Sequence, residues 1–187
     1  AWDAVELPSQ FLENWCWERE SLALISGHHE TGEPLPDELL EKLLAARNFQ
    51  SAMMLDRLLE FSLYDFRLHR DWGTAGISSV QALLDEVRDQ VAVVMPPDFN
   101  RFQNGFSHIF AGGYAAGYYS YKWAEVLSAD AFSRFEEEGI FNRATGDDFR
   151  CNILEAGGSR DPMELFVAFR GRAPDIGPLL RHSGISN

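Results

Sequence analysis

The sequence has few cysteines and little that would place it in a membrane. Its two cysteines, Cys16 and Cys151, are too few for a disulfide framework and too far apart in the chain for a clustered metal site. We therefore expect two reduced, buried thiols. The apolar runs fall well short of the roughly 18 residues that a membrane-spanning helix needs. The start, Ala1-Trp2-Asp3, lacks the basic segment and apolar stretch of a signal peptide.

Positive charge is also scarce. The chain has 16 Lys and Arg residues against 29 Asp and Glu residues, a formal net charge of −13. A nucleic-acid-binding surface needs clustered Lys and Arg, and an anionic membrane attracts the same residues, so both partners are disfavoured. Hydrophobic residues make up 45% and charged residues 24%, an ordinary mixture for a globular protein. We expect a single domain in a cytoplasmic protein that binds neither nucleic acid nor membrane.

Apolar residues recur at helical spacing along most of the chain, and strand-like alternation is absent. Ser78-Ser79 is expected to cap a helix that starts at Val80, and Asp161-Pro162 to start another. Residues 98–113 have no helical period and are predicted to form a long ordered loop, followed by a long helix over residues 114–138. Residues 51–72 form another long segment, periodic in Met54, Leu55, Leu58, Leu59, Ser62, Leu63 and Phe66. We expect an all-α fold of several helices joined by short loops.

Residues 105–123, GFSHIFAGGYAAGYYSYKW, are the most unusual stretch. One histidine and two glycines precede four of the five tyrosines of the chain: His108, Gly112, Gly113, Tyr114, Tyr118, Tyr119 and Tyr121. On a helix, Tyr114, Tyr118 and Tyr121 share one face and Tyr119 points elsewhere. Phenol O–H groups suit the binding of an oxyanion that develops on a carbonyl or phosphoryl group. Aromatic residues at this spacing are also typical of a core, so the pattern indicates either a binding surface or a buried stripe.

The N-terminal stretch carries carboxylates among large apolar residues. Asp3, Glu6 and Glu13 lie on or beside one apolar helix, and Asp3 and Glu6 are three residues apart and can share a face. Pro8 either bends this helix or marks the point where it restarts. Each carboxylate is either a partly buried metal ligand or base, or a side chain that reaches solvent.

The remaining histidines show no metal-binding pattern. His28-His29-Glu30 is not H-E-x-x-H, because Glu33 stands four residues beyond His29, and a turn signal follows it. We expect a solvated turn there.

Two stretches resemble a known family. DAVELPSQFLENWCW, at residues 3–17, and FSHIFAGGYAAGYYSYKW, at residues 106–123, resemble the thimet oligopeptidase and oligopeptidase A family of zinc metallopeptidases. The likeness continues through AFSRFEEEGIFNRATG and LFVAFRGR and covers essentially the whole chain. It implies an all-α, zincin-type catalytic domain, of which these residues would be the C-terminal portion, and short peptides as substrates.

The resemblance also implies roles for individual residues. Glu6 matches the third zinc ligand of the family, and Asp3 an acidic position that orients a metal-bound histidine. Tyr114 and Tyr121 match positions that hold the substrate carbonyl oxyanion. Tyr118 and His108 match substrate-contacting positions, next to the glycine pair Gly112 and Gly113.

The family's H-E-x-x-H motif, which supplies two zinc ligands and the general base, does not occur in this sequence. We therefore expect a piece of a longer protease that is inactive alone, holds zinc weakly or not at all, and needs the upstream part of the same domain. The apolar surface left exposed is expected to promote self-association. The alternative is a non-catalytic helical domain that binds a peptide or a partner protein.

Overall fold

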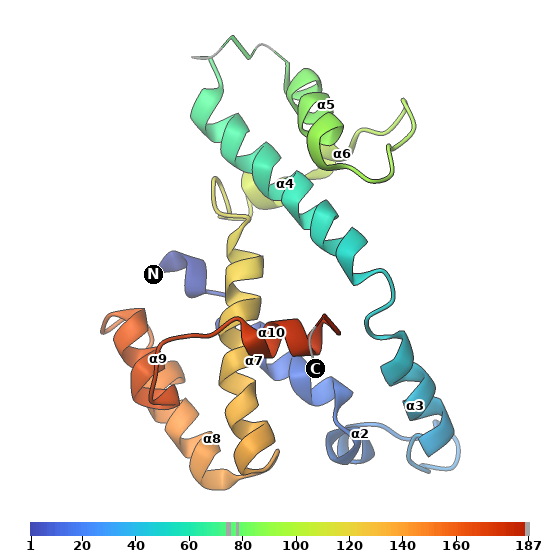
Figure 1. Cartoon of the computed structure of the whole chain (residues 1–187), viewed down its shortest axis with the longest axis vertical. Helices are drawn as coiled ribbons and strands as arrows, with labels where there is room; N and C mark the ends of the chain where they lie inside the picture. The colour runs from blue at the N-terminus through green and yellow to red at the C-terminus, as the bar shows by residue number, and fades with distance from the viewer. Residues whose placement is uncertain (74–75, 78, 186–187) are drawn as a thin grey trace. The chain divides into compact units, whose positions relative to one another are not determined.

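The computed structural model describes residues 1–73, 76–77 and 79–185, which fold into two compact units (Figure 1). Ala1–Phe49 and Trp123–Asn187 form one, called here the terminal unit, and Gln50–Lys122 form the other, the central unit. The described residues contain helices and no β-strand, apart from an isolated bridge between Trp72 and Ile77. The all-α prediction is therefore confirmed. Within the described ranges, no helix is long and apolar enough to cross a membrane.

The helices are mostly short, and two are long. In chain order the α-helices are α1 (Leu7–Glu13), α2 (Arg19–Ile25), α3 (Asp37–Ala46), α4 (Ser51–Asp71), α5 (Val80–Val91), α6 (Phe102–Gly105), α7 (Ser120–Glu138), α8 (Arg143–Phe149), α9 (Pro162–Arg170) and α10 (Gly177–His182). Short 3-10 helices cover Trp2–Ala4, Asn14–Trp17 and Ser107–Ile109, and a π-helical turn covers Arg150–Leu154.

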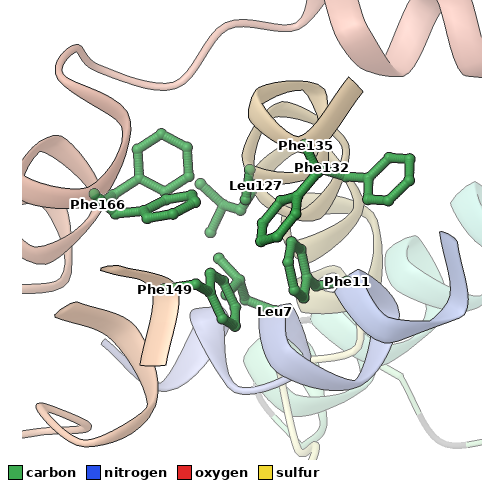
Figure 2. Packing of buried hydrophobic residues seen from close by; sticks show 9 residues of the cluster. Leu7, Phe11, Leu127, Phe132, Phe135, Phe149 and Phe166 are labelled. Atoms are coloured by element: carbon green, nitrogen blue, oxygen red, sulfur yellow. The ribbon is translucent and has the colours of Figure 1, made fainter. Parts of the chain in front are cut away.

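Phenylalanine rings fill the core of the terminal unit. Phe11 of α1 stacks on Phe149 of α8 with ring centroids 3.9 Å apart, and its edge meets Phe135 of α7 at 5.5 Å. Figure 2 shows these rings converging with those of α9. The buried members of this cluster are Leu7, Phe11, Leu127, Ala131, Phe132, Phe135, Phe149, Phe166 and Phe169. These residues come from α1, α7, α8 and α9. Because full burial of one such side chain stabilises a fold by about 1.5–3 kcal/mol, the cluster holds these four helices together.

Beside that core, Asp130 of α7 is 0% exposed and is surrounded by donors. Arg172 donates to both carboxylate oxygens at 2.5 and 2.6 Å, and Arg170 donates at 3.2 Å. The backbone amide of Asp175 donates at 2.7 Å. A buried charge is tolerated only with this kind of pairing. Asp130 therefore fixes the chain after α9 onto α7.

In the central unit, α4 and α5 pack side by side as a helical hairpin (Figure 1). The Ser79 hydroxyl accepts the Ala82 amide at 3.2 Å, which confirms Ser79 as the cap of α5; Ser78 lies outside the described residues. The buried residues between the two helices and the following loop are Tyr64, Leu68, Leu83, Leu84, Val87, Phe106 and Ile109.

The buried face of α4 is not its most apolar one. Met54, Leu55, Leu59 and Phe66 are exposed, whereas Tyr64, Asp65 and Leu68 are buried. Apolar periodicity alone would have predicted the wrong face of this helix to be buried.

The prediction of buried cysteines is wrong. Both Cys16 and Cys151 are free thiols that lie exposed at the surface. Cys16 sits in the 3-10 helix Asn14–Trp17, whose half-buried Trp15 packs against the phenylalanine core. Cys151 is exposed in the π-helical turn Arg150–Leu154.

Candidate functional site

The loop that leads into α7 is closely wound around His108. The amide of Gly112 donates to Ser107 O and that of Tyr114 donates to His108 O, both at 2.9 Å. A Cβ atom at position 112 would lie 2.7 Å from His108 Cα and 2.9 Å from His108 O. Gly113 has φ +85°, a conformation that favours glycine. The two glycines therefore permit this loop path.

The tyrosines do not all lie on a helix, and the predicted helix start at Tyr114 is wrong. α7 begins at Ser120. Before it, the chain makes tight turns in which Gly117 donates to Tyr114 O at 2.9 Å and Ser120 donates to Gly117 O at 3.0 Å. Ala116 has φ +51°, which an α-helix cannot contain. These turns replace the first six residues of the predicted helix.

The turns nevertheless bring together the four rings that sequence analysis singled out. Tyr114 stacks on Tyr121 with centroids 5.0 Å apart, and Tyr118 meets Tyr121 at 5.1 Å. The His108 ring lies 6.0 to 6.4 Å from each of the three phenol rings. We call His108, Tyr114, Tyr118 and Tyr121 the tyrosine–histidine cluster. Tyr119 points elsewhere, as predicted, and stacks on Phe66 at 5.2 Å.

The cluster is partly open to solvent and chemically a set of donors. His108 is exposed and the three tyrosines are half-buried. Burial raises the pKa of Tyr118 above its ordinary value, and neighbouring Tyr121 raises it further. A raised phenol pKa keeps the hydroxyl protonated at neutral pH, so that it remains an O–H donor. The cluster can therefore donate hydrogen bonds to an anionic or carbonyl oxygen bound beside it.

A residue that sequence analysis missed holds this loop. Asp65 of α4 is 0% exposed, and its oxygens accept the amides of Ala116 and Tyr118, each at 2.9 Å. His69 Nδ1 lies 2.9 Å from Asp65 Oδ1. The available signal was spacing, because Asp65 stands in helical register with Phe61, Tyr64 and Leu68, an aromatic face with one carboxylate in it.

The two predicted N-terminal site residues lie in the terminal unit. The helix restarts after Glu6, which is the N-cap of α1, and Pro8 occupies the first turn, where a missing amide costs nothing. Glu6 is half-buried, and its Oε2 accepts the Ser9 hydroxyl at 2.6 Å. This bond, within the V-E-L-P-S-Q block, orients the Glu6 carboxylate.

Asp3 lies in the 3-10 helix Trp2–Ala4 and is half-buried. It lines a groove of about 590 Å³ that is otherwise mainly apolar. The other walls of the groove include Trp2, Leu127, Ile153, Met163 and Phe166. Asp3 therefore lies against apolar side chains, three residues before Glu6 in the chain.

A complete zinc site is not present within the described residues. A catalytic zinc needs three protein ligands, and no group of three or more His, Cys, Asp or Glu side chains is close enough to hold a metal in the ranges that the structure covers. His28 and His29 are exposed in a turn, where His28 Nδ1 accepts the amide of Thr31 at 3.3 Å, so the prediction of a solvated turn is confirmed. Glu6 can therefore supply one ligand of a zinc site but does not form a site with its described neighbours.

Comparison with known proteins decides the family. The family model described as Peptidase family M3 matches residues 1–185. The chain belongs to peptidase family M3. The family resemblance of the N-terminal and tyrosine-rich blocks is thereby confirmed.

Curated relatives of this M3 chain include bacterial oligopeptidases. It is 64% identical over 184 residues to oligopeptidase A of Salmonella typhimurium, covering 98% of this chain and 27% of that protein. Oligopeptidase A of Haemophilus influenzae is 63% identical over 186 residues, covering 100% of this chain and 27% of the relative. Dipeptidyl carboxypeptidase of Escherichia coli is 37% identical over 189 residues, at 98% and 27% coverage. The M3 chain thus spans about a quarter of the length of these relatives.

Proposed function

We propose that this chain is the C-terminal portion of the catalytic domain of a cytoplasmic, zinc-dependent oligopeptidase that hydrolyses short peptides. The observation that carries the proposal is the gathering of three phenols and an exposed imidazole in one loop of an M3-family chain. The relatives named oligopeptidase A support the substrate class.

Hydrolysis of a peptide bond places negative charge on the carbonyl oxygen. Tyr114 and Tyr121, whose rings stack, are proposed to donate their hydroxyl hydrogens to this developing oxyanion. Because the charge is absent in the bound substrate, such bonds favour the transition state and raise kcat rather than affinity. Tyr118 and His108 are proposed to contact the substrate beside them, with the backbone at Gly112 and Gly113 leaving room for it to approach.

Glu6 is proposed to be one ligand of a zinc ion whose other ligands lie outside these residues, and Asp3 to orient one of those ligands. When bound, zinc polarises the scissile carbonyl and lowers the pKa of a coordinated water. The Ser9 hydroxyl holds one Glu6 oxygen at 2.6 Å, which would fix the direction in which the carboxylate presents its other oxygen.

The test uses a protein that carries this chain at the full length of its relatives. Tyr121→Phe removes only the hydroxyl, and we expect kcat to fall about 100- to 1,000-fold while zinc content is unchanged. Glu6→Ala should instead abolish zinc retention, measured by elemental analysis after dialysis. The matched control is Tyr119→Phe, because Tyr119 lies outside the cluster. Wild-type kcat/KM in Tyr121→Phe would rule out the donor role.

A second candidate is a non-catalytic domain that binds a peptide or partner through the tyrosine–histidine cluster. The absence of H-E-x-x-H from the sequence favours it for the 187-residue chain by itself. Cleavage of a quenched fluorescent peptide, with added zinc and with a chelator control, is measured for this chain and for the protein at the full length of its relatives; chelator-sensitive cleavage by the full-length protein favours the oligopeptidase, and its absence favours the non-catalytic domain. We expect no chelator-sensitive cleavage by the chain alone. Cleavage that persists through purification would mean that the ligand assignment, including Glu6, is wrong.

A further inference from the structure

The side chain of Asp65, in α4, hydrogen-bonds the turns before α7. Asp65 is fully buried, and each carboxylate oxygen accepts one backbone amide, Oδ1 from Ala116 and Oδ2 from Tyr118, both at 2.9 Å. A buried carboxylate must be fully hydrogen-bonded to be tolerated. The free-energy cost of burying the Asp65 carboxylate is therefore offset, at least in part, by its hydrogen bonds to two loop amides.

The two amides lie in the segment that connects the stacked tyrosines. Ala116 and Tyr118 stand between Tyr114 and Tyr121, whose rings stack at 5.0 Å. Ala116 adopts φ +51°, a conformation that non-glycine residues avoid and keep only where the surroundings impose it. The Asp65 carboxylate bridges this residue and Tyr118, so it contacts the backbone on both sides of Gly117.

The carboxylate is itself held from its own helix. His69, one turn further along α4, places Nδ1 2.9 Å from Asp65 Oδ1 and 3.0 Å from the Asp65 carbonyl oxygen. The His69 ring also lies 6.0 Å from the ring of Phe110 in the same loop. A side chain with its rotamer locked in this way can set a partner's position accurately.

We propose that Asp65, oriented by His69, is the positioning residue of the tyrosine–histidine cluster. It acts through the backbone amides of Ala116 and Tyr118 and sets the separation and stacking of Tyr114 and Tyr121. The catalytic part of this inference rests on the proposed function of those two tyrosines; the positioning part does not. Small displacements of a catalytic donor lower the rate strongly, so loss of the carboxylate should be seen chiefly in kcat.

The experiment compares Asp65→Asn with Asp89→Asn in the protein at the full length of its relatives. Asparagine keeps the shape of Asp65 but turns one acceptor into an NH₂ donor that faces an amide N–H. Asp89 is an exposed carboxylate of α5 and should tolerate the same change without effect. In Asp65→Asn we expect the amides of Ala116 and Tyr118 to exchange with deuterium much faster, while the α4 and α5 amides keep their protection.

In the same variant we expect kcat to fall about 10- to 100-fold with little change in KM. A double variant, Asp65→Asn with Tyr121→Phe, tests whether the two residues act through one another. If they do, the double variant is little slower than the worse single variant, because coupled sites are non-additive. Losses that multiply would overturn the proposal, since Asp65 would then act independently of the phenol.

Exchange separates failure of this proposal from failure of the proposed function. Unchanged protection of Ala116 and Tyr118 in Asp65→Asn overturns the positioning role whatever the kinetics show. Faster exchange combined with wild-type kcat/KM in Tyr121→Phe supports positioning and removes the proposed function instead. If Asp65→Asn does not fold, an ester in place of the Ala116 amide, introduced with lactic acid, deletes one donor and leaves Asp65 intact. Wild-type kcat in that ester variant, together with a loss of kcat in Tyr121→Phe, would overturn the proposal.

Discussion

The two units each contain a fully buried aspartate, and the partners of the two residues differ in kind. Asp130 in the terminal unit is paired chiefly with the guanidinium groups of Arg170 and Arg172, beside one backbone amide, that of Asp175. Asp65 in the central unit is paired with two loop amides and an imidazole. A buried carboxylate paired with guanidinium groups joins two segments, and removal of one partner is strongly destabilising because the other charge is left buried. A buried carboxylate paired with backbone amides instead holds the path of a loop. A buried aspartate can therefore have either of two structural roles, depending on its partners.

The aromatic residues differ between the units in the same sense. In the terminal unit the rings are phenylalanines that meet one another in a closed core (Figure 2). In the central unit, the tyrosine–histidine cluster consists of half-buried phenol rings around an exposed imidazole. Aromatic content alone therefore does not distinguish a closed core from a partly open cluster; the hydroxyl groups and their exposure do.

The largest expected effect is on stability, at Asp130. Asp130→Ala removes the partner of Arg172 and leaves the Arg170 side chain, which is 10% exposed, without its buried carboxylate. Removal of one member of a buried pair costs about 3–5 kcal/mol, and the remaining bonds of Arg170 to Glu137 place the expectation near the lower value. Urea unfolding of the 187-residue chain, followed by circular dichroism, measures it.

Asp148→Ala is the matched control for Asp130→Ala. Asp148 also pairs with an arginine, Arg134 at 2.8 Å, but its side chain is 53% exposed. Exposed pairs contribute about 0–1 kcal/mol. Equal losses in the two variants would contradict the distinction between a buried junction and a surface pair.

The next effect tests the other unit, at the glycine pair. Gly112→Ala places a methyl group 2.7 Å from His108 Cα, a backbone atom that cannot move without moving the loop. We expect a loss of about 1–3 kcal/mol, typical of overpacking. Gly105→Ala is the control, because a Cβ there meets nothing within 4 Å. Urea unfolding should show no loss in Gly105→Ala; a loss as large as that in Gly112→Ala would mean that the close approach to His108 is unimportant.

Sequence reasoning succeeded where structure is local. Ser79 and Asp161 cap their helices as predicted, because a cap needs only the next two or three amides. The grouping of Tyr114, Tyr118 and Tyr121 was also predicted, but from an α-helix that does not begin until Ser120. The turns that replace the helix depend on hydrogen bonds to Asp65, which lies about fifty residues earlier.

Burial was the less predictable property. The most apolar face of α4 is exposed, and both cysteines are exposed, because burial depends on which surfaces meet in three dimensions. The members of the tyrosine–histidine cluster could be predicted from the residue types in one segment of the sequence. The position of Asp65 on an aromatic helix face could be found from spacing, but its role could not, because the amides that it accepts lie about fifty residues later in the chain.

The smallest predicted effect is the pH dependence of the Asp130 junction. Burial by itself would raise the pKa of Asp130, but the hydrogen bonds from Arg172 and from the amide of Asp175 outweigh it and leave the pKa below its ordinary value of 3.8. The folded state therefore binds this proton less readily than the unfolded state. The contribution to stability is complete above pH 3.8 and is lost as the pH falls through the lower, folded-state pKa.

We accordingly expect the free energy of unfolding of the wild-type chain to fall more steeply below pH 3.8 than that of Asp130→Asn, which has no proton to bind there. Glu41→Gln, at an exposed carboxylate of α3, should keep the wild-type slope. The measurement is a series of urea unfolding curves from pH 7 downward. If Asp130→Asn followed the wild-type slope, the hydrogen bonds from Arg172 and Asp175 would not be lowering the pKa of Asp130.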